Sequence, residues 1–320
     1  MRLSGYLLVL WLAASANFLL PRLLPGDPVE FLVGEEATRL TLAQRTAILA
    51  QFGLDQPLFT QYVNYLSSLA RLDLGASVSH GTMVLDVIAG RTPWTLALVG
   101  SAILLAFVTG FLLACWFHWV RSARSASLLM VGVVSVGSLP PFWVGMVMIA
   151  IFAVRLGWFP SHGAVAPEAE AWIQVFSLMA HAALPVTTLT LSYIPAVFLI
   201  ARAGLEEALS ASYVALAHTQ GAGRARILFR QAAPNAALPL VNQFAMSFGG
   251  LLGGTVTVET VFAYPGLGLT LYEGILAHDF PLVQGIFLLL VFTVVLANLT
   301  ADVAQVLLDP RLRRARWREA

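Results

Sequence analysis

Apolar residues are gathered into long blocks that carry almost no charge, and polar residues fall between these blocks. A helix needs about 20 apolar residues to cross the roughly 30 Å hydrocarbon core of a bilayer. The blocks do not alternate apolar and polar residues as barrel strands do. The pattern therefore predicts an all-α, polytopic membrane bundle. Six spans are predicted, over Leu3–Leu20, Leu96–Phe117, Leu128–Val154, Ala182–Ala201, Ala236–Val261 and Leu282–Leu308.

The first apolar block has two interpretations. Arg2, the apolar run and the small residues Ala14-Ser15-Ala16 together resemble a signal peptide with its cleavage site. The run continues past these small residues to Leu20, which favours an uncleaved first transmembrane helix over residues 1–20. Under both interpretations the segment that follows lies outside the membrane.

The placement of arginine predicts the orientation of the bundle. All eighteen basic residues are Arg. If the N-terminus is cytoplasmic, twelve of them lie inside and six outside, and five of the outer six fall in one long segment, which the positive-inside rule discounts. Both termini are therefore predicted to be cytoplasmic. Residues 21–95 form an extracytoplasmic segment, residues 96–320 the membrane core, and residues 309–320 a cytoplasmic tail.

The extracytoplasmic segment is too long for a bare loop. Two short helices are predicted there, over Thr41–Phe52 and Gln61–Leu72. Thr41 is a candidate N-cap for the first helix, and Gly53 ends it. The segment is either a lid on the outer ends of the spans or a docking surface for an external partner, and the pattern leaves both open.

The cytoplasmic loop at residues 202–235 is the most informative segment between spans. It predicts two helices, Ala203–His218 and Gly223–Ala232, with Gly221 placed for a left-handed stop and Pro234 ending the second helix. The second helix carries three arginines and three large apolar residues: Arg224, Arg226, Arg230, Ile227, Leu228 and Phe229. The loop is either held inside only by its charge or gripped by a cytoplasmic protein, and we favour the second interpretation.

Composition agrees with a membrane protein and excludes several other classes. Hydrophobic residues make up 58% and charged residues 11% of the chain, against roughly 25% charged in soluble domains. The net charge of +1 argues against a nucleic-acid partner. A single cysteine, Cys115, cannot form a disulfide framework or a cysteine metal site within one copy. No cofactor is predicted.

Ionisable side chains are scarce in the predicted spans. The second, third and fourth spans have none, the fifth has Glu259 near its outer end, and the sixth has Asp302 in its inner third. Ion-coupled carriers keep such groups at membrane depth, so their scarcity argues against this class. Enzyme motifs are also missing, and a phosphate-binding loop needs the lysine that this chain lacks. We predict that the chain is not an enzyme and that any ATP is hydrolysed by another chain.

Several motifs resemble the permeases of bacterial ABC importers in the dipeptide/oligopeptide/nickel subfamily. Gly221 and Pro234 stand at the spacing of that family's cytoplasmic loop motif, and Ala215-Leu216-Ala217 occupies the place of its opening Glu-Ala-Ala. Further matches are Pro25-Gly26-Asp27-Pro28, Gly53-Leu54-Asp55-Gln56-Pro57, Asp73-Leu74-Gly75, Arg155-Leu156-Gly157-Trp158, the run from Val258 to Gly268, Asp279-Phe280-Pro281 and Leu308-Asp309-Pro310-Arg311.

The resemblance implies a multi-pass subunit of the bacterial inner membrane, surrounded by lipid. It implies a second homologous permease, two cytoplasmic ATPase subunits and an extracytoplasmic substrate-binding protein as partners. Residues 223–232 take the place of the coupling helix, with Ile227, Leu228 and Phe229 entering a groove on the ATPase while the arginines pair with carboxylates at its rim. The expected coupling residues are Ala217, Gly221, Arg224, Arg226, Ile227, Leu228, Phe229, Arg230 and Pro234.

The sequence is compatible with four functions. A peptide import permease is preferred, and a nickel or metal-chelate permease shares nearly every motif. A stand-alone channel or ion-coupled carrier fits poorly with the uncharged spans. A membrane-embedded structural or assembly protein would not need the spacing of the cytoplasmic loop. The substrate itself is not determined by the sequence.

Overall fold

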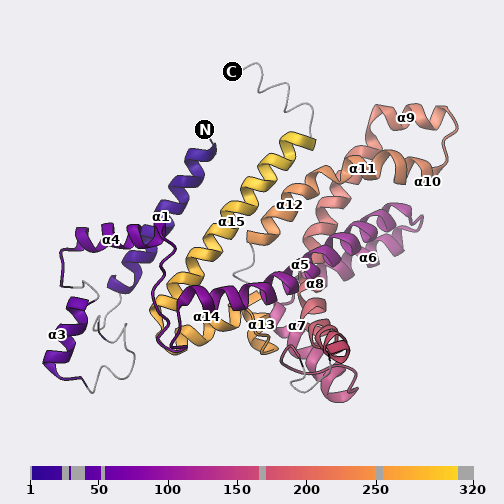
Figure 1. The fold of residues 1–320 in the computed structure, drawn as a ribbon. Coiled ribbons are helices and arrows are strands. Elements are labelled where there is room, and N and C mark those ends of the chain that lie inside the picture. The colour runs from indigo at the N-terminus through magenta and orange to yellow at the C-terminus, as the bar shows by residue number, and fades with distance from the viewer. Residues whose placement is uncertain are drawn as a thin grey trace. The chain divides into compact units, whose positions relative to one another are not determined.

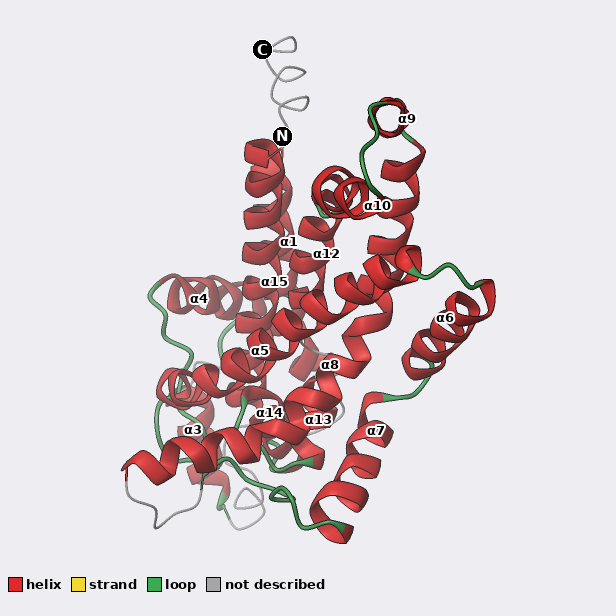
Figure 2. Cartoon of the chain, turned by 90° about the vertical axis from the view of Figure 1, so that its right-hand side faces the viewer, coloured by secondary structure: helices red, strands yellow, loops and turns green. Residues whose placement is uncertain are grey.

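The chain is built mainly of helices joined by loops, in the part that the structure describes. A computed structural model describes residues 2–23, 29, 40–51, 55–165, 171–249 and 255–308. Over these ranges the chain has helices and loops and no strand (Figure 2), apart from one isolated bridge between Ala76 and Met83. The predicted all-α fold is confirmed for this part of the chain. The predicted tail at residues 309–320 and the Pro25–Pro28 motif lie outside it.

The chain divides into two compact units, Met1–Thr95 with Pro265–Val295 (unit 1) and Leu96–Tyr264 with Leu296–Ala320 (unit 2). Figure 1 labels the helices. Unit 1 contains α1 (Arg2–Leu23), α3 (Leu42–Gln51), α4 (Leu58–Ala70), the start of α5 (Val84–Trp119), α14 (Leu267–Leu276) and most of α15 (Phe280–Leu308). Unit 2 contains the rest of α5, α6 (Ala123–Gly137), α7 (Pro141–Met148), η2 (Ile149–Arg155), α8 (Ala171–Ser210), α9 (Ser212–Thr219), α10 (Arg224–Arg226), η3 (Ile227–Ala232), α11 (Ala233–Ala236), α12 (Leu238–Gly249) and α13 (Val256–Val261).

Four described helices are long and apolar enough to cross a membrane: Ser4–Leu23, Val84–Trp119, Gln174–Ser210 and Phe280–Thr300. A fifth crossing is possible if α6 and the helix formed by α7 and η2 make one span. The predicted fifth span, Ala236–Val261, includes residues 250–254, which lie outside the described part. The count of six spans therefore stays a prediction.

The third predicted span, Leu128–Val154, is broken near its middle. Its two halves, Ala123–Gly137 and Pro141–Arg155, are bent by 98° relative to each other. Two consecutive prolines lie at the break, and Pro140 has extended backbone, with φ −61° and ψ 137°. Proline lacks the N–H that continues a helix, and the residue before a proline avoids the helical conformation. Pro141 then begins the second half, where its missing N–H costs nothing.

Helix α8 is the centre of unit 2. Helices α6, α7, α11, α12 and α13 all contact it. Its buried residues Val197, Phe198, Ala201 and Leu205 form one apolar core with residues from α5, α6, η3, α11 and α12. The helix runs without interruption to Ser210, so the predicted separate helix Ala203–His218 is wrong. Its first part belongs to α8, and only α9 forms a separate helix.

Polar side chains join the helices of unit 1. The side-chain Nδ2 of Asn17 in α1 donates to the backbone carbonyl oxygen of Gln284 at 3.2 Å. In return, the side-chain Nε2 of Gln284 in α15 donates to the backbone carbonyl oxygen of Asn17 at 2.8 Å. Such reciprocal bonds hold helices together where lipid offers no hydrogen-bond partner.

The predicted N-cap of α3 is confirmed. The Thr41 side chain accepts a bond from the Gln44 backbone N–H, and the Gln44 side chain accepts a bond from the Thr41 backbone N–H.

A buried carboxylate fixes the start of α15. Asp279 is fully buried, and its Oδ2 accepts bonds from Ser77 Oγ at 2.5 Å, Ser79 N at 2.9 Å and Ser79 Oγ at 2.7 Å. Its Oδ1 accepts a bond from Leu282 N at 3.2 Å. Burial alone raises the pKa of this carboxyl, but the four bonds to its charged form outweigh burial, and the net pKa is below its usual value.

We expect Asp279→Asn to loosen the 75–83 segment, because an amide cannot accept all four bonds and leaves buried donors unsatisfied. The expected cost is about 2–3 kcal/mol. The stabilisation by the ionised group is present above the unfolded pKa of about 3.9 and lost as pH falls through the lower folded value. Hydrogen exchange of residues 75–83 at neutral pH measures the loss, with the exposed Asp55→Asn as control. Equal exchange in both variants contradicts this role.

Candidate functional site

The predicted docking loop is a helical hairpin that follows the end of α8 (Figure 1). Ala211, with φ −72° and ψ 149°, breaks the helix, and α9 then turns away. After a second turn, α10, η3 and α11 follow one another along the chain. Helix α9 contacts η3, and both η3 and α11 contact α8. The hairpin is therefore packed on the central helix of unit 2.

The turn of the hairpin is built on Gly221, as the sequence predicts. Its φ of +78° lies in the left-handed region. Ala222 N donates to the Ala217 carbonyl oxygen and Gly221 N to the His218 carbonyl oxygen, both at 3.0 Å. These two bonds form a Schellman motif, which satisfies carbonyl groups at the end of α9. Ala217 and Ala222 also share one apolar cluster, so the turn is closed by packing as well.

Two of the three apolar residues predicted to enter a partner's groove are buried inside this chain. Ile227 and Leu228 are each only 2% exposed. Ile227 packs with Val214 and Ala217 of α9, and Leu228 belongs to the core around α8. The predicted insertion of Ile227 and Leu228 is therefore wrong, because both side chains hold the hairpin to its own unit. Phe229 is 51% exposed.

Pro234 does not end the second helix. The chain stays helical through η3 and α11, and Pro234 lies in the first turn of α11. Because proline has no N–H to donate to the preceding turn, the helical bonding must change there, and η3 before it is π-helical. A Cβ at Gly204 would lie 3.1 Å from the Ala236 carbonyl oxygen, so α8 and α11 cross closely. The Asn235 amide nitrogen also donates to Tyr213 Oη at 3.2 Å.

Arg224 connects the hairpin to the end of α5. Its Nη2 donates to the His118 carbonyl oxygen at 2.7 Å, one of the last carbonyls of that helix. The guanidinium carbon lies 5.5 Å from the centre of the Trp119 ring, and the Trp119 and Phe229 ring centres are 6.2 Å apart. Arg224 therefore bonds within its own unit, although it was predicted to pair with a partner's carboxylate.

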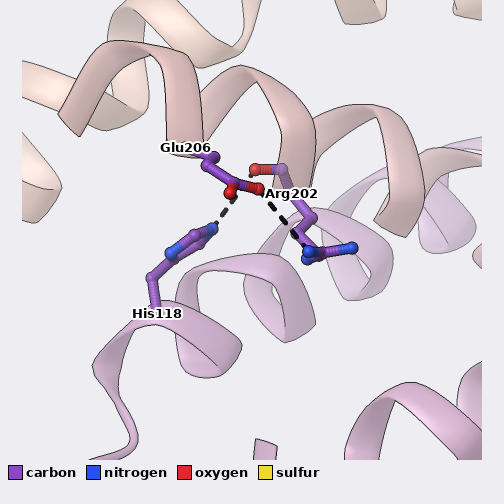
Figure 3. Close-up of polar contacts among 3 residues, drawn as sticks. All are labelled: His118, Arg202 and Glu206. Atoms are coloured by element: carbon purple, nitrogen blue, oxygen red, sulfur yellow. Dashed lines mark hydrogen bonds and ion pairs between the residues drawn. The ribbon is translucent and has the colours of Figure 1, made fainter. Parts of the chain in front are cut away.

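The ends of α5 and α8 are also joined directly. Figure 3 shows His118 facing the end of α8, where its Nε2 lies 3.2 Å from the Arg202 carbonyl oxygen. Arg202 Nη2 lies 3.5 Å from Glu206 Oε2, and the Arg202 guanidinium carbon lies 4.9 Å from the Phe117 ring centre. Exposed ion pairs of this kind contribute little energy. The Arg202–Glu206 pair lies within α8, so the contact that joins α5 to α8 here is the one between His118 and the Arg202 carbonyl oxygen.

The contact residues on α5 were not predicted from the sequence. His118 and Trp119 follow directly after the predicted span Leu96–Phe117, and Trp is common at membrane interfaces. That signal places both residues at the interface but does not show that Arg224, more than one hundred residues later, reaches them.

Three exposed side chains define the outer face of the hairpin: Arg226, Phe229 and Arg230. Arg226 ends α10, and Phe229 and Arg230 follow within one turn in η3, so the three exposed side chains are near neighbours. The face offers one aromatic ring and two cations, which fits an apolar pocket with an acidic rim on another protein. Within the described part of the chain, no cluster of three His, Cys, Asp or Glu residues is suited to hold a metal ion.

Comparison with known proteins gives two family matches and close relatives. Residues 75–314 match the family described as "Binding-protein-dependent transport system inner membrane component". Residues 1–99 match the N-terminal family of the same membrane components. The chain is 33% identical over 316 residues to the "Glutathione transport system permease protein GsiC" of Escherichia coli O6:H1, covering 98% of this chain and 97% of the relative. It is also 33% identical over 315 residues to the "Probable peptide ABC transporter permease protein y4tP" of Sinorhizobium fredii, with the same coverage.

We expect Gly221→Ala to destabilise the hairpin by about 1–2 kcal/mol, because an L-residue resists the left-handed conformation. Gly223→Ala is the matched control, since Gly223 has φ −69° and a Cβ at either glycine meets no atom within 4 Å. Hydrogen exchange of residues 212–226 in the purified chain measures the difference. Equal protection in the two variants means that backbone strain at Gly221 does not limit this turn.

Proposed function

The chain belongs to the family of binding-protein-dependent transport system inner membrane components, and we propose on this basis that it forms half of a substrate path through the membrane. It is a multi-pass permease subunit of a bacterial inner-membrane ABC importer. In the proposed assembly it pairs with a second homologous permease. Two cytoplasmic ATPase subunits hydrolyse ATP, and an extracytoplasmic binding protein delivers substrate. Both termini are cytoplasmic, and residues 21–95 face the binding protein's side.

The proposed coupling site is the outer face of the hairpin. The observation that carries this proposal is that Ile227 and Leu228 are buried while Phe229, between Arg226 and Arg230, is exposed. A loop that only kept its charge in the cytoplasm would not need a closed turn and a packed underside. Phe229 is the aromatic anchor expected at the centre of a protein interface, and the two arginines suit its polar rim.

The packing of the hairpin supports a mechanism for coupling. Leu228 and the crossing at Gly204 attach the hairpin to α8, and Arg224 attaches it to α5. When nucleotide closes the ATPase subunits, a movement of the exposed face is passed to both helices, since the hairpin is packed too tightly to absorb it by bending. The bundle then alternates between outward- and inward-facing states as the two helices move.

We propose peptides as the substrate class. The two relatives are named as glutathione and peptide permeases, and glutathione is itself a tripeptide. Nickel or a metal chelate is the alternative, since it belongs to the same subfamily. ATP-dependent uptake in proteoliposomes that contain the full importer distinguishes the two substrate classes. One assay uses labelled glutathione or dipeptides, and the other uses nickel. Uptake by this chain without an ATPase would instead indicate a channel or carrier.

We expect Phe229→Ala to weaken binding of the ATPase by about 2 kcal/mol, or about thirtyfold in Kd, because it removes the exposed aromatic anchor. Phe176→Ala is the matched control, since Phe176 is also exposed, at 67%, and lies in the first turns of α8, more than twenty residues before the helix reaches the hairpin. Co-purification of the ATPase at a series of salt concentrations, together with ATP-dependent uptake, measures the effect. Unchanged assembly and uptake in Phe229→Ala would contradict the proposed coupling site.

A further inference from the structure

Helix α4 of unit 1 is amphipathic and carries no charged residue between Leu58 and Ala70. Successive residues of a helix are rotated by about 100°. On that projection its apolar and aromatic residues share one side, namely Leu58, Phe59, Tyr62, Val63, Tyr65, Leu66, Leu69 and Ala70. Its polar residues share the other side, namely Thr60, Gln61, Asn64, Ser67 and Ser68.

Helix α1 covers only one part of the apolar side. The Phe18 ring packs against Tyr62 and Tyr65, with ring centres 5.2 and 5.4 Å apart. Tyr62 Oη lies 2.6 Å from Ser15 Oγ, and the Asn17 amide nitrogen donates to Tyr65 Oη at 3.2 Å. Figure 1 shows α4 crossing α1 rather than running along it. These contacts fix α4 to the part of α1 between Ser15 and Phe18.

The rest of the apolar side is exposed. Phe59 is 77% and Val63 47% exposed, and they lie one turn apart on the same face. Thr60, Asn64 and Ser67 are exposed on the polar side. Around its axis α4 therefore has three sectors, one on α1, one apolar and one polar. This is the arrangement of a helix that lies flat between water and lipid beside a transmembrane helix.

The place at which α4 contacts α1 along its length agrees with a position between water and lipid. Helix α1 is a candidate span over Ser4–Leu23, and its apolar run ends at Leu20. Ser15 lies five residues before Leu20, which is about 8 Å deeper at 1.5 Å per residue. Interfacial helices bury their apolar face about 5–10 Å into the boundary between headgroups and acyl chains.

The direction in which the apolar side of α4 faces also agrees with a position between water and lipid. Gln61, on the flank next to Asn64, accepts a bond at 2.8 Å from Arg22, near the end of α1. Tyr62, on the flank next to Phe59, contacts Ser15, which is seven residues earlier in the span. The apolar sector is therefore turned towards the interior of the bilayer and the polar sector away from it.

We propose that α4 is an interfacial membrane helix whose Phe59 and Val63 side chains lie in the lipid leaflet at the C-terminal end of α1. With the orientation proposed above, this is the outer leaflet. Because α4 has no charge, burial of apolar area drives its binding to lipid, and anionic headgroups are not required. The bonds of Tyr62 with Ser15 and of Tyr65 with Asn17 hold α4 to α1 at this level.

Spin labels on α4 test this in the full chain. Cys115→Ala removes the only thiol, and labels are then placed singly at Phe59→Cys and Val63→Cys, with Thr60→Cys and Asn64→Cys as matched controls on the polar side. The chain is placed in nanodiscs of phosphatidylethanolamine, with and without phosphatidylglycerol. Collision rates with oxygen, which enters lipid, and with a nickel chelate, which stays in water, report the surroundings of each label.

We expect the labels at 59 and 63 to favour oxygen over the nickel chelate, at a depth of about 5–10 Å, and those at 60 and 64 to favour the chelate. The result is expected in both lipid mixtures. Labels at 59 and 63 that meet the chelate as often as those at 60 and 64 would place α4 in water and overturn the proposal. Labels at 59 and 63 that are shielded from both reagents would also overturn it, in favour of a covering protein. All four positions are exposed, and the test does not depend on transport.

Discussion

The burial of Ile227 and Leu228 is the interaction on which the proposed coupling depends. These neighbouring side chains pack in two directions, Ile227 against α9 and Leu228 against the core around α8. A helical segment fixed on two sides has only one face left, and that face carries Arg226, Phe229 and Arg230. The same packing that selects the exposed residues connects them to α8, so recognition and transmission of force have one structural cause.

Polar bonds at helix ends have a similar role in both units. In unit 2 the His118 carbonyl oxygen, which the end of α5 leaves without a partner in its own helix, accepts a bond from Arg224. In unit 1 the buried Asp279 carboxylate and the Asn17–Gln284 pair fix the start of α15. A buried or terminal polar group needs a hydrogen-bond partner, and each of these bonds holds two segments together.

Local chemistry could be predicted from the sequence, and features that depend on distant partners could not. The Gly221 stop and the Thr41 cap follow from backbone geometry and neighbouring residues alone, and both predictions are confirmed. The inward orientation of Ile227 and Leu228 depends on α8 and α9, which the pattern of residues 223–232 does not specify. The proline pair at Pro140 was visible in the sequence, but prolines inside spans are often tolerated, so the pair alone did not predict a bend of 98°. For the same reason the contact between Arg224 and Trp119 could not be predicted.

The central claim is that the outer face of the hairpin touches a separate ATPase. The most direct measurement places a photo-crosslinking benzoylphenylalanine at position 229 of the full chain, in cells that express the complete importer, and identifies the captured protein by mass spectrometry. The same amino acid at position 176 is the control, because Phe176 is also exposed and lies in the first turns of α8, far along that helix from the hairpin. The account predicts capture of the ATPase subunit from position 229 and not from 176. Capture from neither position, or equally from both, would contradict it.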